Sequence, residues 1–344
     1  MAAAESTSGA TGAPWLSVLV PVYNVSAYVE ACLHSIIEQA DDGVEILALD
    51  DAGSDDSWAK VERIAHQHPR QLRLLRHERN RGLSAARNSL LAQARGRYVW
   101  FLDSDDILLP GAITGLRAVI AQDAPDLVLC DFAYLRERRS LKHRLRGERH
   151  VRSFAGSTGG ACRDRGALIR GLLEAGELHA WSKIARREAW LHAPFPEGRY
   201  FEDIAVIAPL VIAAGSFAHI AAPWVGYRQH GASILASLTP QRIRDGLTSI
   251  MELQRGLSTP AHASSRSVQR AVEYFALRSF VSMLRRAEAG PLDQEPSLRD
   301  AFAHAHAVLF PQGTASILRD WRSRGWWLRA RRSGRALARH GWQP

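Results

Sequence analysis

Aspartates at alternate positions follow a very apolar run of the chain. Asp103, Ser104 and Asp105 come directly after residues 98–102 (YVWFL). Alternate residues at the end of a strand can direct two carboxylates toward one point. Carboxylate oxygens at this spacing suit Mg²⁺ or Mn²⁺, which also take phosphate and water ligands. The segment therefore predicts a divalent-metal site, with an ordinary polar turn as the alternative.

A second acidic segment, residues 50–56 (DDAGSDD), follows the apolar run 44–49. A carboxylate of Asp50 or Asp51 could accept hydrogen bonds from a base or a ribose. The same residues could instead form a turn in which Ser54 or Asp55 caps the next helix. Neither G-x-G-x-x-G nor G-x-x-x-x-G-K-[ST] occurs in the chain. Their absence argues against a dinucleotide dehydrogenase and a P-loop NTPase.

Short apolar strands that alternate with amphipathic helices are expected to position these groups. We expect strands at residues 15–20, 44–49, 72–75, 98–102 and 126–134. Helices are expected at 26–39, 57–66 and 84–94, between successive strands. The alternation predicts an α/β fold with a mostly parallel sheet and helices on both faces.

The polar segments stand where the expected strands end. Tyr23 and Asn24 follow the first strand, Asp50 and Asp51 the second, residues 80–87 the third and residues 103–106 the fourth. Ligands of open α/β sheets bind beyond the carboxyl ends of the strands. This edge of the sheet is therefore the predicted site.

The net charge of +9 is concentrated in two segments of the 344-residue chain. Residues 136–152 hold eight Lys or Arg and two acids, and residues 319–344 hold eight Arg and one Asp. The remainder is slightly acidic, which argues against a uniformly basic nucleic-acid binder. Three cysteines, none in a C-x-x-C pair, exclude a disulfide scaffold and a zinc knuckle and suit a reducing cytoplasm.

Taken together, the polar segments resemble the family 2 glycosyltransferases in order and spacing. They are 21–24 (PVYN), 50–56 (DDAGSDD), 80–88 (NRGLSAARN) and 103–106 (DSDD). The resemblance continues through 181–183 (WSK), 202–203 (ED) and 227–234 (YRQHGASI), and covers about residues 16–234. That family has the GT-A fold, a Rossmann-like mostly parallel sheet, and its members are inverting enzymes that use nucleotide-diphosphate sugars. A UDP-sugar is the expected donor.

By position, the resemblance implies that Pro21, Tyr23, Asn24 and either Asp50 or Asp51 hold the nucleotide. The family often has D-G-S where this chain has one additional residue, so the choice between the two aspartates stays open.

The resemblance further implies that Arg87 lines the donor pocket and that Asp103 contacts the nucleoside. Lys183 would face the diphosphate or the acceptor, or be a solvated lysine beside a buried tryptophan. Asp105 would bind Mg²⁺ or Mn²⁺, and His230 would contact the metal or diphosphate, or lie in a surface loop.

Asp203 resembles the general base of the family, with Glu202 as its orienting partner. Adjacent carboxylates in partial burial tend to have raised pKa values, which suits a base. The alternative is a pair of acids in the first turn of a helix. As base, Asp203 would take the proton from an acceptor hydroxyl while that oxygen displaces the diphosphate in line, inverting the sugar.

The sequence divides into a disordered leader (1–14), the GT-A domain (15–238), a helical extension (239–310) and a basic-aromatic tail (311–344). In the tail, Trp321, Trp326, Trp327 and Trp342 are interleaved with eight arginines. That mixture suits a helix on an anionic membrane surface, or a helix that packs its indoles on the body. The uncharged stretch 204–227 is expected to form a buried helix and strand. The expected protein is cytoplasmic, peripheral on the inner membrane face if the tail binds lipid.

The expected acceptor is a glycan, a lipid-linked sugar or a cell-surface or wall polymer. Two other functions are consistent with parts of the pattern. A sugar-phosphate nucleotidyltransferase usually has a Gly-rich basic loop near the first strand, and residues 18–26 have none. A non-catalytic nucleotide-sugar-binding scaffold would not need the carboxylates Asp105 and Asp203.

Overall fold

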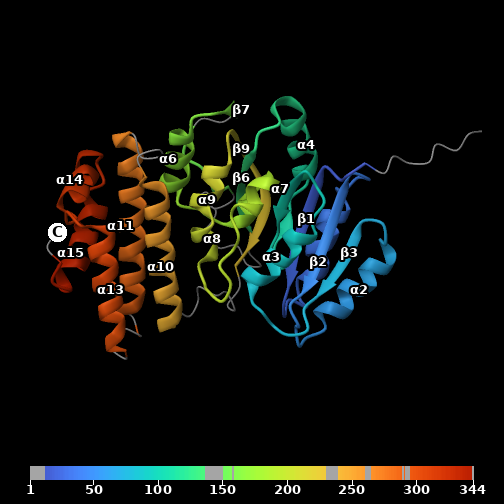
Figure 1. The fold of residues 1–344 in the computed structure, drawn as a ribbon, viewed down its shortest axis with the longest axis horizontal. Helices are drawn as coiled ribbons and strands as arrows, with labels where there is room; N and C mark the ends of the chain where they lie inside the picture. Colours follow the sequence, from blue (N-terminus) through green and yellow to red (C-terminus); the bar gives the residue numbers. More distant parts are fainter. Residues whose placement is uncertain are drawn as a thin grey trace, which may run out of the picture.

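The structure, a computed structural model, describes residues 12–135, 150–156, 159–229, 239–259, 265–288, 290 and 295–342. Most of the expected leader and most of the basic segment 136–152 therefore lie outside the described residues. In Figure 1 the sheet and its covering helices lie on the right, and the C-terminal helices stand beside them on the left.

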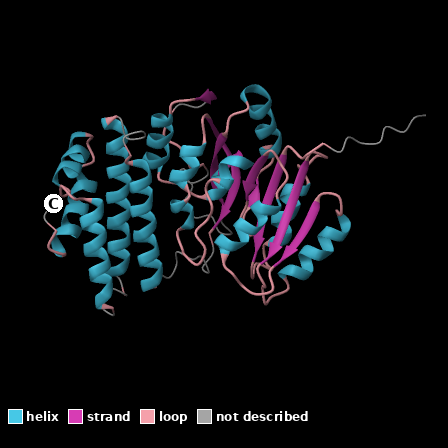
Figure 2. Cartoon of the chain, viewed as in Figure 1, coloured by secondary structure: helices cyan, strands magenta, loops and turns pink. Residues whose placement is uncertain are grey.

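A nine-stranded sheet forms the centre of the first part (Figure 2). Its strands are β1 (Leu16–Val22), β2 (Val44–Asp50), β3 (Leu72–Arg76), β4 (Tyr98–Phe101), β5 (Ile107–Leu108), β6 (Leu127–Leu135), β7 (Gly159–Cys162), β8 (Lys183–Arg186) and β9 (Phe217–Arg228). The order is β3-β2-β1-β4-β8-β6-β9-β5, and β7 pairs with β9. Strands β1 to β4 are parallel, and β8 runs antiparallel between β4 and β6. The expected mostly parallel sheet is confirmed, and β5, β7 and β8 are antiparallel additions that the sequence pattern did not identify.

Helices cover both faces of this sheet. They are α1 (Val29–Ile37), α2 (Ser57–Gln67), α3 (Leu83–Gln93), α4 (Ala112–Asp123), α6 (Arg165–Ala175), α7 (Arg187–Leu191), α8 (Glu202–Ala205) and α9 (Ile207–Ala213). Every residue of β1 and β2 is buried. Successive residues alternate between the faces, so Val18 and Val20 join one core cluster and Leu19 the other. Burial on both faces explains why these strands are continuous apolar runs.

The C-terminal helices pack around a third apolar core. They are α10 (Pro240–Leu257), α11 (Arg266–Glu288), α13 (Pro296–Leu309), α14 (Ala315–Ser323) and α15 (Trp327–Arg339). Trp321 is 1% exposed and lies against Tyr274, with ring centroids 5.4 Å apart. Trp342 stacks on His306 at 4.9 Å. The tail of the sequence analysis therefore packs on the preceding helices through most of its indoles, and Trp327 is the exception at 64% exposed.

The uncharged stretch 204–227 lies in the sheet domain. It forms the second half of α8, all of α9 and nearly all of β9, so the expected buried helix and strand are present. Among the described residues, no helix has the length and apolar character needed to cross a membrane.

Candidate active site

The loops at the carboxyl edge of the sheet are tied to one another by side chains. Asn24 adopts a left-handed backbone conformation (φ 51°) just after β1, and its Oδ1 accepts a hydrogen bond from the amide of Ser54 at 2.8 Å. The adjacent Tyr23 is 48% exposed, whereas Pro21 is buried within β1. Asn24 therefore joins the two loops, and Tyr23 offers an open aromatic face beside them.

Asp50 and Asp51 are both buried but have different partners. Asp51 accepts hydrogen bonds from the amides of Arg81 (2.9 Å) and Gly82 (2.7 Å), and its Oδ1 lies 2.6 Å from His77 Nδ1. These contacts fix the loop that enters α3. The Oδ1 of Asp50 accepts from the amide of residue 53 at 2.9 Å, and its Oδ2 lies 3.0 Å from the exposed Arg76.

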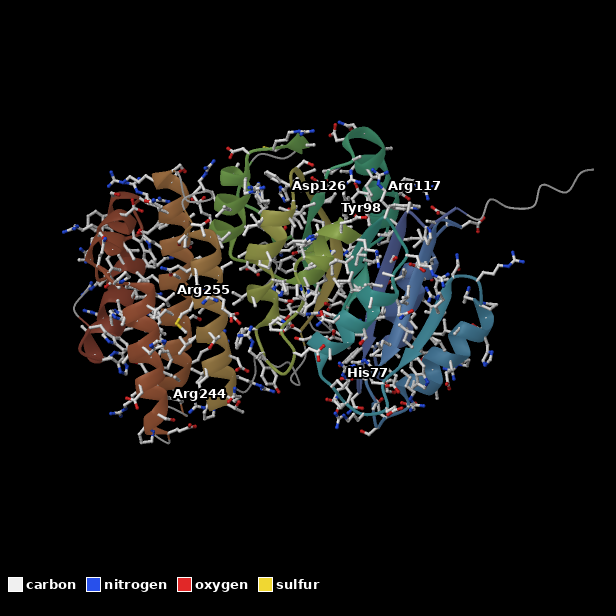
Figure 3. All side chains as sticks on the ribbon, in the orientation of Figure 1. His77, Tyr98, Arg117, Asp126, Arg244 and Arg255 are labelled. Carbon is white, nitrogen blue, oxygen red and sulfur yellow. The ribbon has the colours of Figure 1, made fainter. Side chains whose placement is uncertain are left out.

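His77, which the sequence analysis did not select, marks this edge in Figure 3, at the opposite end of the sheet from Tyr98 and Asp126. Its second ring nitrogen lies 2.9 Å from Ser89 Oγ. The ring therefore joins the Asp51 carboxylate to helix α3.

Helix α3 places Arg87 among three carboxylates. The guanidinium is 1% exposed. Its Nη2 donates to Asp103 Oδ1 at 2.7 Å. Its Nη1 donates to Glu202 Oε1 at 2.7 Å and to Asp203 Oδ1 at 3.0 Å. The ring of Phe195 lies beneath, 5.1 Å from the guanidinium carbon. One cation therefore joins the end of β4 to the start of α8.

The charges of this cluster depend on one another. Burial opposes the charge of Arg87, but Asp103, Asp203 and Glu202 outweigh burial and raise its pKa further. Burial, and then the charge of Asp203, raise the pKa of Glu202 above its ordinary value, against the effect of Arg87. Glu202 is thus the member of the cluster that takes up a proton more readily than a free glutamate.

The acidic turn after β4, residues 103–106, faces the end of β9. Asp106 Oδ1 accepts from the amide of Arg228 at 2.8 Å, and the Arg228 side chain donates to the carbonyl of Asp105 at 3.0 Å. Asp106 Oδ2 is buried without a hydrogen-bond partner among the described residues. Burial, and then Asp105 and Asp103, raise the pKa of Asp106 well above its ordinary value.

Oxygen ligands at this turn fit a hard divalent cation, but they form an incomplete set. In the described part of the chain, no three His, Cys, Asp or Glu side chains converge to hold a metal. A cation held by Asp105 would therefore need oxygens from water or from a ligand diphosphate. His230 lies outside the described residues, so its contact with the metal or the diphosphate stays a prediction.

Lys183 is fully buried below this edge. Its Nζ donates to the carbonyl of His179 at 2.8 Å, to Ser182 Oγ at 3.0 Å and to the carbonyl of Glu177 at 3.4 Å. Burial lowers the pKa of Lys183 to about 8, although the charge of Asp203 partly opposes this effect. The ammonium holds the turn before β8 and is not the solvated lysine of the alternative interpretation.

Comparison with known proteins identifies the N-terminal part of the chain. Residues 17–174 match the family model for Glycosyl transferase family 2. This part of the chain is a family 2 glycosyltransferase domain. The uncharacterized glycosyltransferase EpsJ of Bacillus subtilis (strain 168) is 35% identical over 119 residues, which are 35% of this chain and 34% of EpsJ. The chain thus matches about a third of the length of this relative.

Solved structures extend the likeness beyond that domain. Residues 1–349 of Staphylococcus aureus TarS, in complex with UDP-GlcNAc, align with a TM-score of 0.68 and 19% identity, over 86% of this chain and 81% of TarS. The mannosyltransferase PcManGT of Pyrobaculum calidifontis, in complex with GDP-Man and Mn²⁺, aligns with a TM-score of 0.51 and 19% identity over 87% and 86%. The α/β fold with its C-terminal helices is the GT-A fold expected from the sequence.

The fold brings most of the expected site residues to one edge of the sheet. Arg87 contacts Asp103, Glu202 and Asp203 directly. Asn24 and Asp51 instead bond the loops around them, and Lys183 bonds the turn beneath. The structure shows where these side chains lie and what they contact. The nucleotide-binding role of each one stays a prediction.

His179 was missed because a histidine two residues before Trp181 carries no recognisable motif. Its ring stacks on Trp181 at 4.6 Å with an interplanar angle of 6°. Its Nδ1 lies 4.0 Å from Asp203 Oδ2. The histidine therefore belongs to the same edge as the carboxylates.

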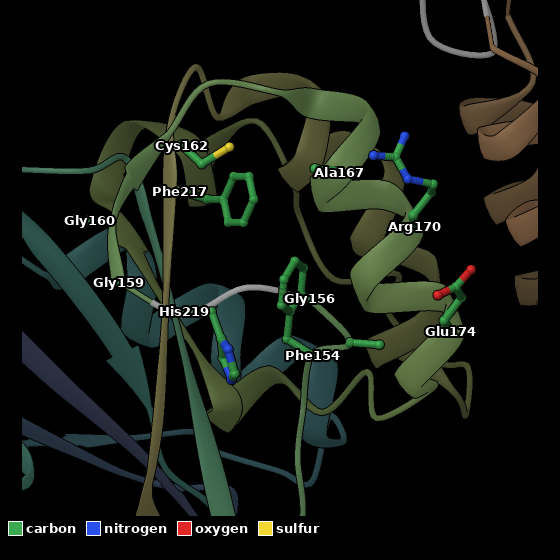
Figure 4. A pocket seen from close by; sticks show the side chains of 11 residues that line it. Phe154, Gly156, Gly159, Gly160, Cys162, Ala167, Arg170, Glu174, Phe217 and His219 are labelled. Atoms are coloured by element: carbon green, nitrogen blue, oxygen red, sulfur yellow. The ribbon is translucent and has the colours of Figure 1, made fainter.

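A separate cavity of about 410 Å³ lies toward the opposite edge of the sheet, at the start of β9 (Figure 4). Its lining includes Phe154, Cys162, Arg170, Phe217 and His219. Buried His219 contacts Asp131 at 2.8 Å. None of the expected site residues lines this cavity.

The burial of Lys183 predicts a pH dependence of stability. Its pKa is about 8 in the folded protein against an ordinary value of 10.5, so the unfolded chain binds more protons between these pH values. The contribution of Lys183 to the free energy of unfolding therefore rises with pH between these two values. We expect the difference in unfolding free energy between wild type and Lys183→Met to grow in favour of wild type from about pH 8 to pH 10. Urea denaturation measures it, and a constant or shrinking difference would contradict the burial of the ammonium.

Proposed function

We propose that this protein is an inverting glycosyltransferase that moves a sugar from a nucleotide-diphosphate donor to a hydroxyl acceptor. The single observation that carries the proposal is the contact of Arg87 with Asp103 on one side and with Glu202 and Asp203 on the other. Arg87 and Asp103 lie in the part of the chain that matches the family 2 model, and the contact joins this expected donor side of the edge to the expected base.

The donor is proposed to be a UDP-sugar, with its base beside the exposed ring of Tyr23. The solved complex of TarS with UDP-GlcNAc supports this choice of nucleotide. Between the two aspartates left open by the sequence, we assign the nucleotide contact to Asp50. The carboxylate of Asp51 is already occupied by two backbone amides and His77, whereas Asp50 Oδ2 meets only an exposed arginine.

We propose Asp203 as the base that takes the proton from the acceptor hydroxyl. Arg87 donates to its Oδ1 and so holds one oxygen of the carboxylate at this edge of the sheet. The pKa of neighbouring Glu202 is raised, so Glu202 holds a proton more readily than a free glutamate. A Mg²⁺ or Mn²⁺ ion on Asp105 would supply neutralisation of the charge on the departing diphosphate. The complex of PcManGT with GDP-Man and Mn²⁺ supports a divalent metal beside the donor.

Calorimetric titration with UDP, GDP, CDP and dTDP, each with and without Mn²⁺, tests the donor site. We expect one nucleotide to bind in a metal-dependent manner, and binding to be lost in Asp105→Ala but kept in Asp203→Asn. With the matching sugar nucleotide, Asp203→Asn should lose turnover by about 10²-fold or more because the base is absent.

Two results would contradict this account. Failure of a folded protein to bind any of the four nucleotides would remove the donor site. Binding without turnover in the wild type would favour the scaffold interpretation instead.

We further propose that α15 rests on an anionic membrane surface, where a lipid-linked or polymeric acceptor would be presented. Trp327 and Leu328 are 64% and 69% exposed in its first turn. Arg331, Arg332 and Arg335 are exposed one to two turns later on the same outward face. None of the three arginines has an ion-pair partner within the described ranges. Two exposed apolar side chains beside three exposed arginines suit insertion into the headgroup region of an anionic membrane.

Vesicle co-sedimentation tests this surface. We expect the protein to bind vesicles of phosphatidylglycerol and phosphatidylcholine but not of phosphatidylcholine alone, and a Trp327→Ser, Leu328→Ser double variant to lose binding. Arg117→Gln, a change at an exposed arginine on the other part of the molecule, is the matched control. Equal sedimentation of the double variant and wild type would rule out this surface.

A further inference from the structure

The turn between α6 and β8 holds His179 in a fixed place. Helix α6 ends at Gly176, which has φ +76°, and the chain then passes Glu177 and His179 before β8. The buried ammonium of Lys183 holds this turn by donating to the carbonyls of both residues, at 3.4 and 2.8 Å. The backbone that carries the imidazole is therefore anchored from inside the protein.

The imidazole ring is equally constrained. It lies parallel to the ring of Trp181, which is 1% exposed. Tyr227 lies 5.6 Å away, and Phe132 meets the ring edge-on at 5.9 Å. The side chain of His179 nevertheless keeps 28% of its surface exposed. These aromatic neighbours set the plane of the ring, and so fix where its two nitrogens point.

Those nitrogens lie between two carboxylates. Nε2 is 3.4 Å from Glu177 Oε2, and Nδ1 is 4.0 Å from Asp203 Oδ2. Burial raises the pKa of Glu177, but the contact with His179, together with the charges of Arg278 and Lys183, brings that pKa below its ordinary value. Among the described residues, the charged groups around this contact also include Lys183, which bonds the His179 carbonyl, Arg278, which acts on Glu177, and Arg87 with Glu202 beside Asp203.

The contact matters because Arg87 holds only one oxygen of Asp203. Arg87 donates to Oδ1, while Oδ2 faces His179. A carboxylate held at one oxygen can still turn about its Cβ–Cγ bond. A second donor on Oδ2 would remove that freedom and leave a lone pair of this oxygen for the acceptor hydroxyl.

We propose that His179 is a positioning residue for Asp203: as an imidazolium with Glu177 beside its Nε2, it attracts Asp203 Oδ2 toward Nδ1 across 4.0 Å and so limits the rotation of that carboxylate. The role rests on the proposed function, in which Asp203 is the base. The acceptor proton moves to Asp203, and His179 keeps its own proton throughout. Loss of that proton at higher pH then lowers turnover.

The first test needs no donor. NMR titration of the histidine ring carbons in the full chain gives the midpoint of His179, whose signal is assigned by its loss in His179→Gln. We expect Asp203→Asn and Glu177→Gln each to lower this midpoint by about half a unit or more, because each removes a nearby negative charge. Midpoints that stay unchanged in both variants overturn the proposal, whatever the activity of the protein.

The second test uses the sugar nucleotide that the wild type turns over. His179→Phe keeps a ring on Trp181 but has no donor, and should lower kcat by about 10-fold or more with the donor KM unchanged. His179→Gln keeps a donor that does not titrate, so it should retain more activity and lose the alkaline decline of the pH profile. His34→Gln, on the exposed side of α1, is the control.

Full activity of His179→Phe, or an unchanged alkaline decline in His179→Gln, overturns the positioning role. Absence of turnover in the wild type instead counts against the proposed function, and the NMR titration still decides whether His179 and Asp203 interact.

Discussion

The guanidinium of Arg87 is the interaction on which the arrangement of the site depends. It is buried, and a buried charge is costly unless it is paired and hydrogen-bonded. Its partners come from distant parts of the chain: Asp103 is 16 residues away, and Glu202 and Asp203 are 115 and 116 residues away. Pairing the cation therefore requires β4 and α8 to meet over α3.

The position of Arg87 in turn depends on contacts made by Asp51, which follows the strand β2. Asp51, at the end of β2, bonds the amides of Arg81 and Gly82 and contacts His77. These bonds fix the entry of α3, and Arg87 follows within two turns. On the other side, the buried Lys183 holds the turn that carries His179 toward Asp203. Asp51 and Lys183 are buried, and no ligand is assigned to them in this account. They position Arg87 and His179, which contact the proposed base.

The sequence predicts the strands well because β1, β2 and β4 are buried on both faces and read as apolar runs. It does not reveal β8, a four-residue strand whose first residue is a buried lysine paired to backbone carbonyls. Nor does it reveal the partners of Arg87 or the stacking of His179, since both depend on contacts between remote segments. The indoles of the tail show the same limit: composition cannot tell that Trp321 packs inward while Trp327 faces outward.

A double-mutant cycle on the stability of the protein tests the central role of Arg87 most directly. The free energy of unfolding would be measured for Arg87→Met, for the triple variant Asp103→Asn, Glu202→Gln, Asp203→Asn, and for the combination. The account predicts that Arg87→Met alone costs about 3 kcal/mol because it leaves three partly buried carboxylates unpaired. In the triple-variant background the same change should cost at least ~2 kcal/mol less. Additive effects would show that the carboxylates do not depend on Arg87, and would contradict the account.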